Sequence, residues 1–171
     1  MVQATTTRMA AVAAPTDVAL WALCARKHAD RFACRPVAPG GLGLFFGVQP
    51  DGSVAACWTC PPGGESHRGI VHGGLLATAL DSAMVHALFA RGIVARTAEL
   101  KVRYRHPAGV GAGLEVRAWL RRSFGQLHEL EAEICGGSVA YAHARAKFMA
   151  ASSTERAAND PANLIAMPNE W

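Results

Sequence analysis

The sequence predicts an α+β fold in which a curved antiparallel sheet wraps around one long helix. Between Gly73 and Ala90, apolar residues recur at the three-and-four spacing of a helix. From Thr97 to Phe148, apolar and polar residues alternate, which is the period of strands with one buried face. The side of the helix opposite its apolar stripe is also mostly small and apolar. The simplest packing therefore surrounds this helix with the sheet.

The chain outside this region is predicted to add one helix and two tails to a single domain. Residues 15–34 predict an N-terminal helix, because Thr16 or Asp17 can cap it and apolar contacts follow. The domain is expected to span residues 16–150. The Ala/Thr-rich residues 1–15 and the polar, Ala-rich residues 151–171 are expected to be flexible tails.

A hairpin is predicted before the long helix. Two short apolar segments, Leu44–Val48 and Ser53–Cys60, flank the sequence Gln49-Pro50-Asp51-Gly52. Asp-Gly tolerates a positive φ at little cost and is typical of tight turns. Residues 61–69 are rich in Gly and Pro and are expected to form an irregular connection.

Four strands are predicted after the helix, in an antiparallel meander that follows chain order. Short turns are expected at Pro107–Gly113, Ser123–Gly125 and Gly136–Gly137. In the first strand, Ala98, Leu100, Val102 and Tyr104 form the apolar face. Thr97 then lies on the polar face with Glu99.

Bulk properties exclude several classes of protein. The longest apolar segment is interrupted by Asp81 and His86, so no membrane span is expected. The net charge is +4, and the basic residues are scattered rather than clustered, which argues against a nucleic-acid partner. The five cysteines and the absence of a secretory signal favour reduced thiols and a cytoplasmic location.

The start of the long helix has the features of an oxyanion-binding site. Gly73 and Gly74 lie where loop becomes helix, so their N–H groups lack intrahelical acceptors. Without a Cβ they allow close approach to a position that the helix dipole makes positive. The same glycines would also suit a simple helix-start turn. Asp81 lies on this apolar helix, where burying an unpaired carboxylate is costly, so some compensation is required. A functional site is favoured over a structural ion pair.

The spacing of these residues argues for a homodimer. Asp81 lies eight residues beyond Gly73, which is about 12 Å along a helix. One helix therefore cannot bring both groups to the same carbonyl. Two antiparallel helices from different subunits can bring Gly73 of one close to Asp81 of the other.

The segment resembles a branch of the hotdog-fold acyl-CoA thioesterases. That branch carries an HGG motif and a downstream helical Asp, as in Gly69-Ile70-Val71-His72-Gly73-Gly74 followed by Asp81. The strand from Arg96 to Pro107 is also similar, and the resemblance extends over residues 41–149. Thr97 falls sixteen residues after Asp81.

The resemblance implies hydrolysis of an acyl-CoA thioester without a cofactor. It assigns the role of oxyanion donor to the Gly73 N–H and the role of general base or nucleophile to Asp81. As a nucleophile, Asp81 would form a mixed anhydride. Thr97 would orient the water or the carboxylate, although strands favour threonine in any case. His72 would position the thioester or brace the loop. The assembly would be a homodimer, with a dimer of dimers as an open alternative.

Other residues are candidates for substrate binding. Several relatives carry Asn or Gln shortly before HGG. This chain has neither there, which leaves Ser66 or His67 as substitutes. Gly74 is a further candidate for substrate binding. Arg103 and Arg105 could meet the phosphates of coenzyme A, although outward strand arginines are more often simply solvated. Two alternatives stay open: a non-catalytic acyl-CoA-binding dimer, favoured by the missing Asn or Gln, and an acyl-thioester hydratase or dehydratase.

No metal site is expected. Cys57 and Cys60 would point to opposite faces of a strand, and no second Cys-x-x-Cys completes a tetrahedral set. Cys24, His28 and Cys34 could add ligands only in principle.

Overall fold

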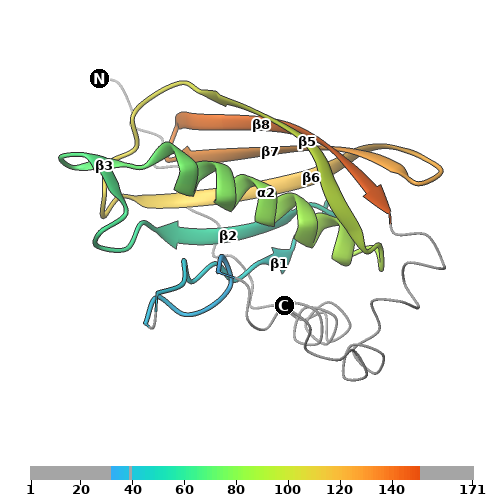
Figure 1. Ribbon diagram of the computed structural model, residues 1–171, viewed down its shortest axis with the longest axis horizontal. Helices are drawn as coiled ribbons and strands as arrows, with labels where there is room; N and C mark the ends of the chain where they lie inside the picture. Colours follow the sequence, from blue (N-terminus) through green and yellow to red (C-terminus); the bar gives the residue numbers. More distant parts are fainter. Residues whose placement is uncertain (1–31, 39, 151–171) are drawn as a thin grey trace, which may run out of the picture.

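The computed structural model describes residues 32–38 and 40–150 (Figure 1). The predicted N-terminal helix lies outside these residues except for positions 32–34, which form turns, and both predicted tails also lie outside them. Within the described residues, no helix is long and apolar enough to cross a bilayer.

One helix lies against the concave face of a six-stranded antiparallel sheet, as the sequence predicts (Figure 1). The helix is α2, Gly73–Phe89, close to its predicted bounds. In spatial order the strands are β1 (Gly47–Val48), β2 (Val54–Thr59), β6 (Gly113–Phe124), β7 (Leu127–Gly136), β8 (Val139–Ala150) and β5 (Ala95–Tyr104).

The predicted meander is wrong for its first strand. β6, β7 and β8 are neighbours in chain order, but β5 pairs with β8 at the sheet edge and not with β6. The cause is the length of the connections. Two-residue connections after β6 and β7 force hairpins, with Gly125 and Gly137 at positive φ. The longer connection of residues 105–112 lets the chain cross from β5 to the far side of β7.

Residues 61–69 are not wholly irregular, in contrast to the prediction. β3 (Glu65–His67) and β4 (Ile70–Val71) form a small antiparallel hairpin. Its turn contains Gly69 at a φ of 76°, and the Gly69 N–H donates to the Glu65 carboxylate at 3.3 Å. Such short strands show no apolar alternation, so periodicity could not reveal them.

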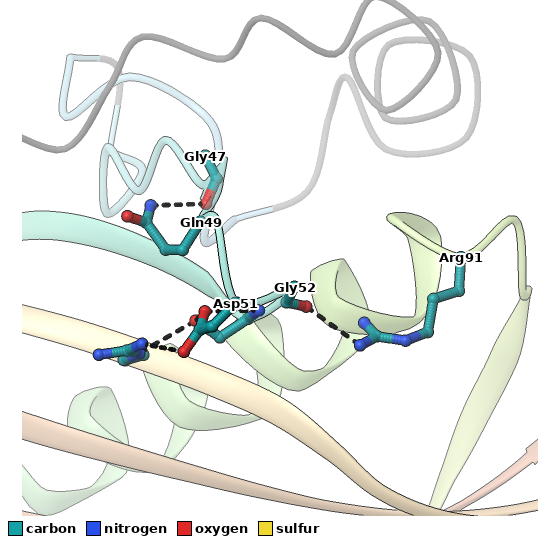
Figure 2. Close-up of polar contacts among 7 residues, drawn as sticks. Gly47, Gln49, Asp51, Gly52 and Arg91 are labelled. Carbon is teal, nitrogen blue, oxygen red and sulfur yellow. Dashed lines mark hydrogen bonds and ion pairs between the residues drawn. The ribbon is translucent and has the colours of Figure 1, made fainter.

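The predicted β1–β2 hairpin is present, with a shorter first strand than expected. Its turn is tied to the helix end, because the Arg91 guanidinium donates to the Gly52 carbonyl at 3.1 Å (Figure 2). The same guanidinium donates to the Ala87 carbonyl at 2.9 Å. Asp51 accepts bonds from both the hydroxyl and the N–H of Ser53. These bonds, the Ser53 hydroxyl first, hold the pKa of Asp51 below its ordinary value.

The core lies between α2 and the sheet, but one strip of the helix is not covered. Leu76, Leu80, Met84 and Leu88 are fully or almost fully buried. On the opposite side of the helix, five residues keep part of their surface exposed: Gly74, Ala77, Thr78, Asp81 and Ser82. The described residues of one chain therefore wrap the helix incompletely.

A buried histidine should make the stability depend on pH. His128 is 5% exposed on β7, its Nδ1 lies 2.9 Å from the Ser123 hydroxyl, and burial lowers its pKa below the ordinary 6.5. Below pH 6.5 the unfolded chain therefore binds more protons than the folded one, and stability falls. We expect the free energy of unfolding, measured with urea, to fall less steeply below that pH in His128→Asn. An equal slope in the variant and the parent would contradict the assignment.

Candidate active site

Asp81 meets Thr97 where the partly exposed strip of α2 faces the edge strand β5. The Thr97 hydroxyl donates to Asp81 Oδ1 at 2.7 Å. Asp81 is half-buried and Thr97 is exposed, so the pair opens to solvent in the single chain. The bond fixes one carboxylate oxygen and leaves the other available to a water or a substrate.

A β-bulge aims Thr97 at the helix. Thr97 is paired with Phe148, which is fully buried, whereas Glu99 is paired with the exposed Lys147; Ala98 between them is the extra residue. The bulge shifts the alternation by one position. The prediction that Thr97 shares the polar face with Glu99 is therefore wrong, and this correction is what brings the hydroxyl to Asp81.

At the start of α2, the Gly73 N–H has no hydrogen-bond acceptor within the helix. His72 is the N-cap, with φ −61° and ψ 128°, and its Nδ1 accepts the Gly74 N–H at 2.9 Å. The His72 carbonyl accepts the Leu75 N–H at 2.9 Å. Gly73, at the first helical position, has no intrahelical acceptor for its N–H. Of the two predicted glycines, Gly73 is thus the one whose N–H is available, and the His72 side chain caps the start of α2.

Tyr104 is a site residue that sequence reasoning missed. Its hydroxyl donates to the Gly73 carbonyl at 2.9 Å, and a Cβ placed on Gly73 would lie 3.4 Å from the phenol ring. The apolar alternation of β5 had placed Tyr104 simply on the core face. One feature of the sequence could have indicated it: Tyr104 lies on the same predicted strand as Thr97, seven residues further on.

The two halves of the candidate site lie apart in one chain. Gly73 and Asp81 are eight residues apart on α2, which places them about 12 Å apart along its axis. Tyr104 and Thr97 mark the same two positions on β5. In a single chain, the Gly73 N–H and the Asp81 carboxylate are therefore too far apart to contact one atom.

The other candidates lie in two places, on the hairpin before α2 and at the end of β5. Ser66 and His67 are exposed on β3, with the Ser66 hydroxyl 3.4 Å from His67 Nδ1. That hairpin leads into His72, whose N–H donates to the Gly64 carbonyl at 2.8 Å. Arg105 is exposed just beyond β5. Arg103 is exposed on the outer face of the sheet, because it is paired with His143 while its neighbour Tyr104 faces the helix.

The outer face also carries a hollow of about 270 Å³, which lies across the sheet from Asp81 and is not part of this site. Ion pairs such as Arg145–Glu131 at 3.0 Å cross it. Cys57 on β2 is exposed, whereas Cys60, which follows the last residue of that strand, is buried. Among the described residues, no group of three or more His, Cys, Asp or Glu side chains is placed to hold a metal ion.

Comparisons with known proteins agree with this fold. Residues 68–150 match the family described as "Thioesterase superfamily". No curated protein matches the sequence. A putative thioesterase from Ralstonia eutropha JMP134, a phenylacetic acid degradation-related protein, is 26% identical, with a TM-score of 0.59 over 67% of this chain and 90% of its own.

Two further solved structures share the fold. The thioesterase superfamily protein RHA08564 is 24% identical with a TM-score of 0.60; the match covers 62% of this chain, which spans only 55% of that protein's length. A protein from Streptococcus mutans UA159, solved with acetyl CoA, is 16% identical with a TM-score of 0.56 over 59% of this chain and 82% of its own. The curved antiparallel sheet around one helix is thus the hotdog fold.

Proposed function

We propose that this chain, whose residues 68–150 belong to the thioesterase superfamily, hydrolyses an acyl-CoA thioester to the free acid and CoA. The observation that carries the proposal is the Asp81–Thr97 hydrogen bond of 2.7 Å on the open strip of α2. A carboxylate on a mostly apolar helix, held by a hydroxyl and open on one side, is suited to proton transfer or attack. The likeness to a protein solved with acetyl CoA supports a CoA thioester as the substrate.

The thioester carbonyl oxygen would accept the Gly73 N–H. Negative charge develops on this oxygen when the carbonyl carbon is attacked, and a fixed donor at a helix N-terminus stabilises that charge. Asp81 would take a proton from the attacking water, which then adds to the carbon as CoA leaves as a thiol. Alternatively, Asp81 would attack the carbon itself to give a mixed anhydride that water then cleaves.

A second copy of the chain would complete the site. β5 is an edge strand, largely exposed, and the strip of α2 beside it is partly uncovered. An antiparallel copy would pair β5 with β5 and pack strip against strip.

A single two-fold axis would bring together the two halves of the site from different copies. Ala77 lies midway between Gly73 and Asp81 on α2. Because Ala98 is the extra residue of the bulge, the midpoint between Thr97 and Tyr104 on β5 falls at Lys101. An axis through both midpoints would place the Gly73 end of one copy beside the Asp81 end of the other. The spacing on the helix and the spacing on the strand thus support the same dimer.

The function is tested with the purified full chain and a panel of short, medium, long and aromatic acyl-CoAs. Release of free CoA thiol from at least one of them supports the proposal. Binding of acyl-CoA without release would favour the non-catalytic alternative. Water addition or elimination on the acyl chain, detected by mass spectrometry with the thioester intact, would favour a hydratase or dehydratase.

The Thr97 hydroxyl should matter for turnover more than for stability. Thr97→Val keeps the β-branched shape but removes the hydrogen bond to Asp81, so the carboxylate loses its fixed orientation. We expect kcat to fall about tenfold to a hundredfold, the equivalent of one hydrogen bond to a charged group. Thr97→Ser, which retains the hydroxyl, should lose less. Equal activity of the Val variant and the parent would show that threonine is present only as a strand-forming residue.

A further inference from the structure

The geometry points to Tyr104 as a positioning residue that fixes the direction of the Gly73 N–H; this inference rests on the proposed function of that donor. The Tyr104 hydroxyl donates to the Gly73 carbonyl at 2.9 Å. Its ring also lies against Gly73, since a Cβ there would be 3.4 Å from the phenol. Tyr104 therefore touches the residue that carries the donor without being the donor.

The peptide that joins Gly73 to Gly74 is held at both of its ends. Its carbonyl accepts from the Tyr104 hydroxyl, and its N–H donates to His72 Nδ1 at 2.9 Å. Fixing this peptide fixes ψ of Gly73, while the preceding carbonyl, that of His72, is fixed by the Leu75 N–H at 2.9 Å. The two peptide planes that flank Gly73 are thus both tied down, and its N–H keeps one direction.

Such bonds are needed because two consecutive glycines form the least restricted backbone in a chain. An oxyanion donor contributes most when it is already oriented before charge develops. The first turn of a helix also lacks half of its backbone hydrogen bonds and tends to fray. The Tyr104 bond opposes both kinds of motion at the point where the donor is required.

Tyr104 acts from the same strand as Thr97. Both side chains face the helix from β5, and each bonds one functional group of α2, Gly73 or Asp81. The strand that would pair with the second copy therefore also sets the positions of both functional groups. Because Tyr104 is 51% exposed, its hydroxyl can be removed with little loss of core packing.

Tyr104→Phe removes this hydroxyl and keeps the ring. Using the acyl-CoA that the parent hydrolyses best, we expect kcat to fall about fivefold to twentyfold, with KM changed less than about twofold and the pH profile unchanged. Backbone ¹⁵N relaxation of glycine-labelled protein should show greater mobility at the amides of Gly73 and Gly74. Tyr141→Phe, which removes the chain's other phenol hydroxyl, is the control and should change neither measurement.

Several results would overturn the inference. An unchanged kcat would do so, as would a raised KM with normal kcat, which would make the phenol a simple substrate contact. A reduced kcat with unchanged glycine mobility would place the effect elsewhere. The NMR measurement needs no substrate, so it separates this inference from the proposed function. If the parent hydrolysed no thioester but Tyr104→Phe still mobilised the two amides, the hydrolase proposal would fail and the positioning contact would stand.

Discussion

Replacing Asp81 with Asn is expected to lower kcat for acyl-CoA hydrolysis by on the order of 10²–10⁴-fold, the usual contribution of a positioned proton acceptor. The amide has nearly the same shape and can still accept the Thr97 hydroxyl. It can neither take a proton from water nor attack a thioester. Because Asp81 is only half-buried, the substitution should leave the fold intact, which circular dichroism and thermal unfolding would check.

The neighbouring Ser82→Ala provides a matched control. Ser82 lies on the same partly exposed strip, and its backbone carbonyl, which lies 2.7 Å from the buried His86 Nδ1, is retained in the variant. Its loss should leave kcat within about twofold of the parent, in the range of ordinary surface substitutions. If Asp81→Asn retained full activity, the carboxylate half of the site would be misassigned, whatever the fold.

A single turnover in H₂¹⁸O separates the two routes that Asp81 could take. If Asp81 activates water, the acid released in the first turnover carries ¹⁸O. If Asp81 forms an anhydride that water cleaves at the Asp81 carbonyl, the first acid carries a protein-derived ¹⁶O and the label enters Asp81. Mass spectrometry of the acid and of the peptide containing Asp81 would distinguish them.

Periodicity was sufficient to predict the elements of this fold but not their order. The long helix is unambiguous because its apolar residues follow the three-and-four spacing over all of its 17 residues. Three of the four later strands form the expected meander. The position of β5 depends on which strand it pairs with, and alternation within a strand carries no such information. Only the length of the connection at residues 105–112 hinted at a crossing.

The candidate site was predictable where it depends on helix geometry and not where it depends on strand geometry. Gly73 and Asp81 follow from their positions on α2. The approach of Thr97 to Asp81 requires the bulge at Ala98, which reverses the face that simple alternation assigns. Tyr104 looked like one more apolar strand residue, because its hydrogen bond joins two elements 31 residues apart in the sequence.

Replacing Gly73 with Pro should remove the oxyanion donor itself and lower kcat by about 10²–10³-fold. Proline has no N–H, and it is well tolerated at the first position of a helix, where that N–H has no intrahelical acceptor. The preceding residue, His72, already has the extended conformation that proline favours, with φ −61° and ψ 128°. The helix should therefore start as before without its donor.

Gly73→Ala separates loss of the N–H from loss of glycine. It keeps the donor, and its Cβ would lie 3.4 Å from the Tyr104 ring, which is ordinary van der Waals contact. We expect kcat to stay within about threefold of the parent, since no hydrogen bond is removed. If the Ala variant were as inactive as the Pro variant, the requirement at this position would be for space or flexibility, and the N–H would not be the oxyanion donor.

Mixing the two inactive variants should restore activity if each site is shared between copies. In a dimer of one Asp81→Asn chain and one Gly73→Pro chain, one of the two shared sites has both its Gly73 N–H and its Asp81 carboxylate. The other site has neither. Random pairing at equal amounts makes half of the dimers mixed, so about a quarter of the parental activity should return after co-refolding or co-expression. If instead Gly73 and Asp81 of one chain act together, every site in the mixture lacks one group and no activity returns.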